Sequence, residues 1–157
     1  MGKRSPFRYT LPAMPYAVGI DTVEIPRVQR VLERHGERFL NRVYTPTEVA
    51  FCRGRVPELA ARFAAKEAVM KALGTGVRGV AWREIEVLPD RRGKPLIYLY
   101  GGAKARAEEI GLYGIDVSLS HERQYAIASV VASREDEEDP AVSRERLVKR
   151  LTERGLL

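Results

Sequence analysis

Two carboxylates stand in apolar surroundings, where an ionised side chain needs a partner. Asp21 interrupts the apolar, β-branched run at 16–24, and Glu67 lies in the alanine-rich segment 59–73. Burying an ionised carboxylate is unfavourable unless a cation, a metal or amide donors stabilise it. Mg²⁺ takes one or two protein carboxylates and completes its coordination with waters and phosphate oxygens. In a domain of this size, the pair therefore suits a Mg²⁺ site.

Each carboxylate also has an ordinary structural explanation. Asp21 can cap the helix that follows its strand, and Glu67 can pair with Lys71, since glutamate four residues before lysine is the favoured order in a helix. Taken singly, the helical ion pair is the simpler interpretation of Glu67. Only the two carboxylates together favour a metal.

Basic side chains share the segment with Glu67. Arg62, Lys66 and Lys71 would face the negative charge of a phosphate that completes the metal site. Gly74 and Gly76 close the segment and would allow a nucleotide to approach the backbone. A helix C-cap explains Gly74 equally well, because a lone Gly-x-Gly is a weak signal.

Nucleophilic catalysis is not favoured by the remaining candidates. Ser120 and His121 are neighbours in a predicted strand and point to opposite faces, so they are poorly placed as nucleophile and base. His121 at a strand end is better suited to contact an anion, with a plain turn histidine as the alternative. Cys52 is the only cysteine, which excludes an internal disulfide and favours packing and a reducing, cytoplasmic location.

The segment that carries Glu67 is predicted to be a helix buried nearly all round. Larger apolar side chains fall on one side of 59–73 and alanines on the other, leaving no broad polar face. Its charged side chains must therefore have partners, because burying an unpaired charge costs on the order of several kcal/mol.

A strongly cationic face is predicted on the first helix, which begins at Pro26 and is interrupted at Gly36. Apolar residues form one side, and basic residues recur near the other, at Arg27, Arg30, Arg34 and Arg38. The pattern Thr45-Pro-Thr-Glu48 is typical of a capping box and predicts a short helix to about Cys52.

The remaining elements complete an α+β pattern. We expect a strand at 16–24, a hairpin of 82–88 with 95–100, a helix at 102–110 and a second hairpin of 115–120 with 125–132. Residues 1–15 are expected to be a flexible lead-in, 16–133 one domain, and 134–157 a charged C-terminal helical extension.

The net charge of +6 is unevenly placed along the 157 residues. Residues 1–133 hold 21 basic and 14 acidic side chains, so the domain itself is the basic part. A basic domain predicts an anionic partner. The apolar runs are too short to span a bilayer, and the N-terminal residues do not resemble a secretory signal.

From Ala17 to Ala132 the motifs resemble, in order, the holo-acyl-carrier-protein synthases, the small bacterial-type 4′-phosphopantetheinyl transferases. The matching residues are Gly19-Ile-Asp21, Arg62-Phe-Ala-Ala-Lys-Glu-Ala68 with Lys71 and Gly74-Thr-Gly76, Gly93-Lys-Pro95, Val117-Ser-Leu-Ser-His121 and Tyr125-Ala-Ile-Ala128. The resemblance implies a short, mostly antiparallel sheet packed on a long buried helix. It also implies Mg²⁺-dependent transfer of the phosphopantetheine arm of coenzyme A to a serine of apo acyl carrier protein, with release of adenosine 3′,5′-bisphosphate.

Residue roles follow from the same resemblance. It implies that Asp21 and Glu67 hold Mg²⁺ with the coenzyme's pyrophosphate, that Lys66 and Lys71 lie near that pyrophosphate, and that Gly74 belongs to the coenzyme site. Arg62 and His121 are expected near the 3′-phosphate or adenosine. The resemblance further implies a homotrimer with coenzyme A between subunits, and an acidic carrier protein docked on the basic first helix.

The mechanism expected from these roles is positioning and charge stabilisation around an in-line attack by the serine. Lys71 or Lys66 would stabilise the leaving bisphosphate, and either a metal-bound water or Glu67 would accept the serine proton. Two other classes remain open on the sequence: a basic nucleic-acid-binding domain, which leaves Asp21 and Glu67 unexplained, and a scaffold protein without turnover.

Overall fold

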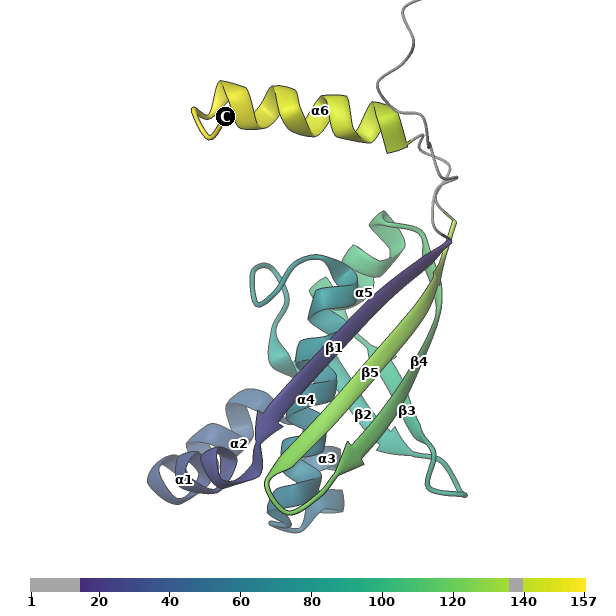
Figure 1. The fold of residues 1–157 in the computed structure, drawn as a ribbon. Helices are drawn as coiled ribbons and strands as arrows, with labels where there is room; N and C mark the ends of the chain where they lie inside the picture. The colour runs from purple at the N-terminus through teal and green to yellow at the C-terminus, as the bar shows by residue number, and fades with distance from the viewer. Residues whose placement is uncertain (1–14, 136–139) are drawn as a thin grey trace, which may run out of the picture.

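A computed structural model describes residues 15–135 and 140–157. Its centre is a three-stranded antiparallel sheet in the order β1 (Tyr16–Glu24), β5 (Tyr125–Arg134) and β4 (Leu112–His121). The long helix α4 (Val56–Leu73) packs against one face of this sheet (Figure 1). The predicted α+β class, with an antiparallel sheet on a long buried helix, is confirmed.

The alternation of β1 explains why one of its faces meets α4. Ala17, Gly19, Asp21 and Val23 point inward, while the residues between them point away from the helix. A Cβ built on Gly19 would lie 1.8 Å from the carbonyl oxygen of Ala68, so only glycine permits this close approach of strand and helix.

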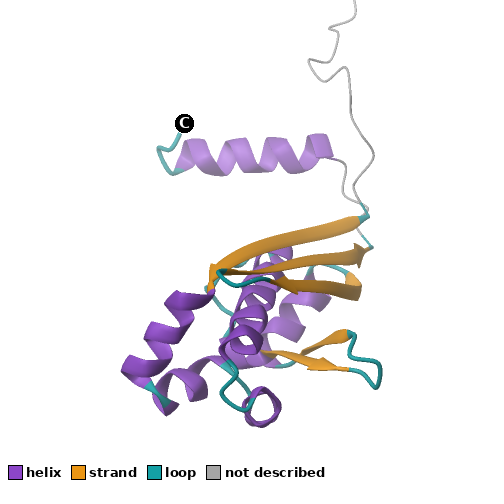
Figure 2. Cartoon of the chain, turned by 60° about the horizontal axis from the view of Figure 1, so that its bottom comes forward, coloured by secondary structure: helices purple, strands orange, loops and turns teal. Residues whose placement is uncertain are grey.

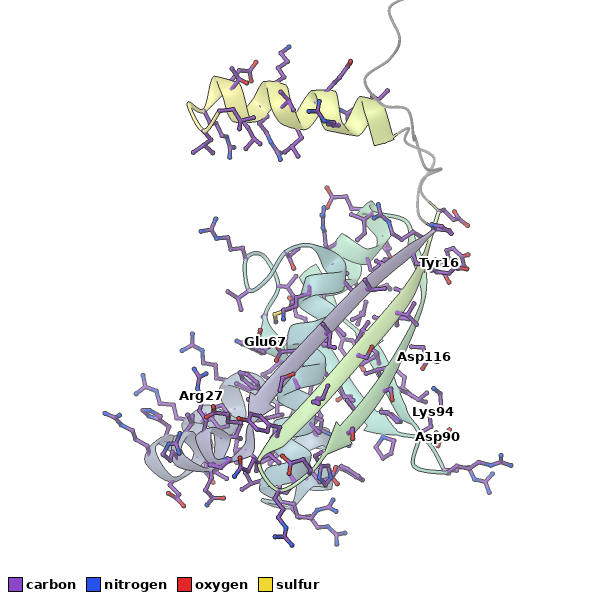
Figure 3. The ribbon with its side chains drawn as sticks, viewed as in Figure 1. Tyr16, Arg27, Glu67, Asp90, Lys94 and Asp116 are labelled. Carbon is purple, nitrogen blue, oxygen red and sulfur yellow. The ribbon has the colours of Figure 1, made fainter. Side chains whose placement is uncertain are left out.

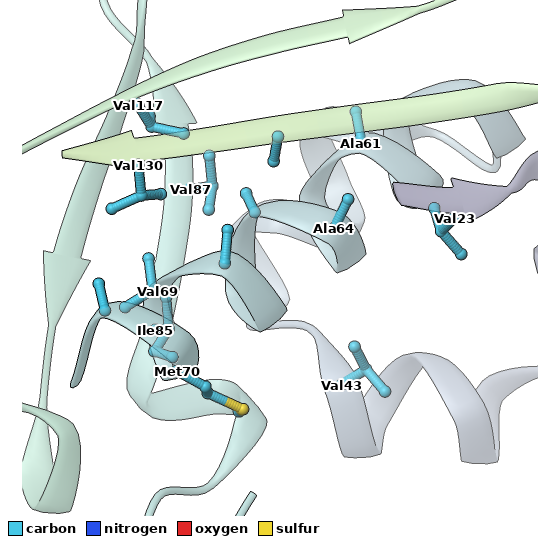
Figure 4. Packing of buried hydrophobic residues seen from close by; sticks show 14 of the residues in the cluster. Val23, Val43, Ala61, Ala64, Val69, Met70, Ile85, Val87, Val117 and Val130 are labelled. Carbon is cyan, nitrogen blue, oxygen red and sulfur yellow. The ribbon is translucent and has the colours of Figure 1, made fainter. Parts of the chain in front are cut away.

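Helix α4 is buried along most of its length, as its sequence predicts. Its alanines let the sheet approach closely, and its larger side chains pack elsewhere in the core. Figure 4 shows Val69 of α4 near Ile85, Val87 and Val130 in this core. The helix ends where Gly74 adopts a left-handed φ of 71°, which is the C-cap role expected as the alternative for this glycine.

Three short helices connect β1 to α4 and lie on the same side of the sheet (Figure 2). They are α1 (Ile25–His35), α2 (Glu37–Val43) and α3 (Pro46–Cys52). Gly36 separates the first two, with a φ of 50°. The capping box predicted at Thr45 and Glu48 is present, because the Thr45 hydroxyl accepts from the Glu48 amide and the Glu48 carboxylate accepts from the Thr45 amide.

The first hairpin starts later than the sequence predicts. Residues Trp82–Glu84 form a 3-10 helix, η1, and only Ile85–Pro89 (β2) pairs with Pro95–Leu99 (β3). The Glu84 carboxylate accepts hydrogen bonds from the amides of Ala81 and Ala103, which holds this turn against α5 (Gly101–Glu109). Ala103 is 19 residues from Glu84, so the strand pattern alone could not exclude a longer strand.

Helix α6 (Pro140–Glu153) lies in the segment where the sequence predicts a charged extension. Most of the expected flexible lead-in at 1–15 is outside the described residues, and so is most of the acidic run at 135–139. Among residues 15–135 and 140–157, no helix combines the length and the apolar character needed to cross a bilayer.

Candidate active site

Asp21 and Glu67, 46 positions apart in the sequence, line the same pocket. Asp21 is on the inward face of β1, and Glu67 is on α4 directly before Ala68, the residue that Gly19 contacts. The pocket has a volume of about 320 Å³ and is also lined by Arg27 and Phe63. Figure 3 shows Glu67 beside β1, with Arg27 at the start of α1. The close packing of strand on helix is therefore what brings the two carboxylates together.

The electrostatics of this pocket favour a bound cation. Partial burial raises the pKa of Glu67, and the negative charge of Asp21 raises it further, while Lys71 and Arg27 act in the opposite direction. Within the described part of the chain, no donor hydrogen-bonds to the Glu67 carboxylate. A half-buried carboxylate without a donor, beside a second carboxylate, fits the oxygen ligands that Mg²⁺ uses.

Lys71 is paired with Asp21 rather than with Glu67. Its ammonium donates to the Asp21 Oδ1 at 3.1 Å and to the carbonyl oxygen of Ile20 at 2.7 Å. The Lys71 side chain is half exposed, whereas only 16% of the Asp21 side chain is exposed. A half-exposed cation thus contacts one of the two carboxylates that line the pocket.

Metal coordination by protein atoms alone is not complete in this pocket. The described residues contain no group of three or more histidine, cysteine, aspartate or glutamate side chains placed to hold a metal ion. Two carboxylates leave most of an octahedral shell to water and to ligand oxygens, which is the usual arrangement for Mg²⁺ bound with a phosphate.

Arg62 and His121 line a second pocket, of about 480 Å³, with Phe51 and Pro95. Arg62 is buried, and its guanidinium carbon lies 4.5 Å from the centre of the Phe51 ring. Its Nε donates to the carbonyl oxygen of Val87 at 3.0 Å, and its Nη1 donates to the Glu58 carboxylate at 2.8 Å. These bonds fix the guanidinium through Nε and Nη1. Its Nη2 makes none of them and can still donate to a ligand.

The two pockets of one chain do not merge. Arg62 and Glu67 are five residues apart, which turns their side chains about 140° from each other around the helix axis. The structure thus brings together Asp21, Glu67 and Lys71 in one place and Arg62 with His121 in another. Gly74 lines neither of these two pockets.

The expected contact of Lys66 with the coenzyme is corrected by the structure. Lys66 is fully buried, and its ammonium donates to the Glu48 carboxylate at 2.7 Å and to the carbonyl oxygens of Ile85 and Trp82 at 2.6 and 3.1 Å. All three donors are used within the core, so none is left for a ligand. The sequence pattern could not predict the Lys66–Glu48 ion pair, because the same pattern assigns Glu48 only to the capping box at Thr45.

The four arginines proposed for docking are all exposed but differ in position. Arg27, Arg30 and Arg34 lie on α1, and Arg38 follows Gly36 on α2. Arg27 also lines the pocket of Asp21 and Glu67, a role that the sequence reading did not assign. Its position three residues after the end of β1 is the signal that would have suggested this.

The sequence matches known proteins over the part of the chain that carries both pockets. Residues 17–130 match the protein family described as ACPS, 4′-phosphopantetheinyl transferase superfamily. A holo-(acyl-carrier-protein) synthase of Dehalococcoides mccartyi (strain ATCC BAA-2266 / KCTC 15142 / 195) is 52% identical over 114 residues, covering 73% of this chain and 95% of that protein. That of Koribacter versatilis is 46% identical over 122 residues, covering 75% and 98%.

Solved structures of similar proteins have the same fold. The holo-(acyl-carrier-protein) synthase of Neisseria meningitidis superposes with a TM-score of 0.72 at 38% identity, covering 77% of this chain and all of that chain. The synthase of Helicobacter pylori, crystallised in complex with coenzyme A, superposes with a TM-score of 0.69 at 32% identity, covering 74% and 99%.

Proposed function

Because the chain belongs to the holo-(acyl-carrier-protein) synthases of the 4′-phosphopantetheinyl transferase superfamily, we propose that Asp21 and Glu67 form the metal-binding part of its active site. The protein is a transferase that moves the phosphopantetheine arm of coenzyme A to acyl carrier protein, and the resemblance stated from its motifs is confirmed. Membership of an enzyme family decides against a scaffold without turnover, and no observation favours nucleic acid as the partner.

The convergence of Asp21 and Glu67 in one pocket is the observation that carries the proposal. When bound there with coenzyme A, Mg²⁺ neutralises negative charge on the pyrophosphate. Lys71, released from Asp21, contacts the same pyrophosphate and stabilises the bisphosphate that leaves. Glu67, which lines the same pocket, is the proposed acceptor of the serine proton.

Coenzyme A is proposed to bind between two copies of the chain. The pocket of Arg62 and His121 suits the 3′-phosphate or the adenosine, but in one chain it is separate from the carboxylate pocket. A neighbouring copy that contributes its Arg62 and His121 would complete the site, and Gly74 would border the coenzyme next to Lys71.

An exposed apolar patch on the outer face of the sheet supports such an assembly. It comprises Val18 and Ile20 of β1 and Tyr125, Ile127 and Val131 of β5, with Val18 70% exposed. Contiguous apolar patches of this kind mark protein contacts. We propose that they pair subunits in a homotrimer, and that the protein is cytoplasmic, in keeping with its single, buried cysteine.

The basic surface of α1 and α2 is the proposed docking site for the acidic carrier protein. Arg30, Arg34 and Arg38 are exposed there, and Arg27 links this surface to the carboxylate pocket. A carrier protein docked on these arginines would present its serine at the pocket entrance. Complementary charge of this kind speeds encounter and fixes orientation.

Transfer assays with carboxamide variants test the metal assignment. Asp21→Asn and Glu67→Gln should each abolish the mass gain of one phosphopantetheine arm on apo carrier protein, since removing a metal ligand removes charge neutralisation. Glu33→Gln, an exposed α1 residue, is the matched control and should retain activity. Normal turnover by Glu67→Gln, with circular dichroism showing an intact fold, would remove Glu67 from the site.

A further inference from the structure

An apolar groove lies between α5 and the start of β4, away from both pockets of the proposed active site. It has a volume of about 230 Å³ and is lined by Leu99, Lys104, Ala107, Glu108, Leu112 and Ile115. Apolar side chains form its floor, and Lys104 and Glu108 of α5 flank it with opposite charges. This α5 groove belongs to none of the contacts assigned above.

Helix α6 presents apolar side chains that are exposed or only partly covered. Leu147, Val148 and Leu151 fall on one side of the helix, and Lys149 and Glu153 fall on the opposite side. Leu147 is 44% exposed, and Figure 1 shows α6 lying apart from the sheet and its helices. An amphipathic helix normally gains its stability by covering such a face.

The α5 groove is within reach of α6 of the same chain. Leu112, in the groove wall, is paired with Arg134, and the amide of Glu135 donates to the carbonyl oxygen of Gly111 at 2.9 Å. Five residues, 135–139, separate this point from α6, and an extended chain of that length spans at most about 17 Å. Leu147 lies roughly 10 Å along the helix from Pro140. The apolar side of α6 can therefore be placed over the groove while every strand stays where it is.

Charge supports α6 as the occupant, and the short tether favours α6 of the same chain over that of a second copy. Residues 140–157 hold five basic and two acidic side chains, and the C-terminal turn of α5 carries Glu108 and Glu109. Arg150, which flanks the apolar side of α6, can approach these glutamates at the groove edge. Three apolar side chains bury far less surface than the roughly 1,000 Å² needed for a stable interface between separate chains. A short tether compensates by holding the two surfaces at an effective concentration on the order of millimolar.

We propose that α6 folds back on its own chain and packs Leu147, Val148 and Leu151 into the α5 groove. The groove and the helix face are then one buried contact. The proposal does not depend on the assignment of the active-site residues.

Disulfide trapping in the full-length protein tests this contact directly. Lys104→Cys combined with Leu151→Cys should form an intrachain disulfide at least tenfold faster than Lys104→Cys combined with Glu153→Cys, which places the thiol on the opposite side of α6. Peptide mapping separates these bonds from Cys52, which is buried. Equal rates for the two pairs, or disulfides found only between chains, would overturn the proposal.

Hydrogen exchange provides a readout that needs no cross-link. Leu147→Glu with Leu151→Glu should speed amide exchange at 103–115 at least fivefold, because the groove loses its cover. Lys149→Gln with Glu153→Gln, on the polar side, should leave exchange unchanged. Identical exchange in both variants would show that α6 does not cover the groove.

Discussion

The Lys71 ammonium donates to the Asp21 carboxylate at 3.1 Å and to the adjacent carbonyl oxygen of Ile20 at 2.7 Å. The cation thus rests on one of the two carboxylates that we assign to the metal. Binding of a divalent cation and pyrophosphate must draw this lysine away from Asp21, and its half-exposed side chain is free to make that movement.

Replacing Lys71 should therefore separate metal binding from transfer. Lys71→Met removes a competing cation, so Mn²⁺ alone should bind about twofold to fivefold tighter, in line with the small energy of an exposed ion pair. Transfer should fall by at least about a hundredfold, as for loss of an oxyanion-stabilising donor. Titration calorimetry and carrier-protein mass measure the two effects. Lys94→Met, which removes a similarly exposed lysine from its pair with Asp116, is the control for metal affinity. Weaker Mn²⁺ binding in Lys71→Met would contradict the competition.

The raised pKa of Glu67 predicts how stability depends on pH without metal. Burial, followed by the charge of Asp21, raises this pKa above its usual value of 4.5, so the folded protein binds the proton more tightly than the unfolded chain. The contribution of Glu67 is then fully present below the unfolded pKa and is lost as pH rises through the folded pKa. Wild-type protein in chelator should lose stability relative to Glu67→Gln across that range, measured by thermal unfolding. Added Mg²⁺ should reverse the loss in the wild type alone. Parallel pH curves for the two proteins would contradict the assignment.

Gly19 should be required for the geometry of the carboxylate pair. A Cβ at this position would lie 1.8 Å from the carbonyl oxygen of Ala68. Because that oxygen belongs to the backbone of α4, no flexible side chain can move aside to relieve the clash. Gly19→Ala should cost about 1–3 kcal/mol of stability, as overpacking does, and should weaken Mn²⁺ binding because β1 carries Asp21. Gly114→Ala is the control, since its nearest atom, Ser133 Oγ, would lie at 3.9 Å. Wild-type Mn²⁺ affinity in folded Gly19→Ala would show that the two carboxylates tolerate separation.

The sequence pattern was sufficient where one property repeats locally. The alternation at 16–24 predicted β1 and placed Asp21 on its inner face, and the alanine-rich segment predicted a buried helix. It was insufficient where a side chain's partner is remote. Lys66 and Glu67 are neighbours of similar polarity, yet only the packing of α3 and β2 on one side of α4 decides that Lys66 belongs to the core.

Lys66 should behave as a core residue in mutagenesis. Burial lowers its pKa and Glu48 opposes this, so removing the lysine strands a fully buried carboxylate. Lys66→Met should cost about 3–5 kcal/mol of unfolding free energy, and Lys66→Met with Glu48→Gln should recover part of it. Chemical denaturation measures both. The fraction that folds should retain the wild-type KM for coenzyme A. A raised KM with unchanged stability would return Lys66 to the coenzyme site.

Charge reversal on α1 should affect the carrier protein and not the coenzyme. Arg30→Glu with Arg34→Glu leaves Arg27, and with it the carboxylate pocket, intact. Loss of electrostatic attraction should raise the KM for carrier protein at least tenfold at low salt, with a smaller difference from wild type at high salt, because salt screens exposed charges. The KM for coenzyme A should stay within twofold. Arg78→Glu with Arg83→Glu, at two exposed positions outside α1 and α2, controls for the same change in net charge. If the coenzyme KM rises instead, α1 contacts the coenzyme and the carrier protein docks elsewhere. If the control variant has the same effect, net charge rather than this surface governs recognition.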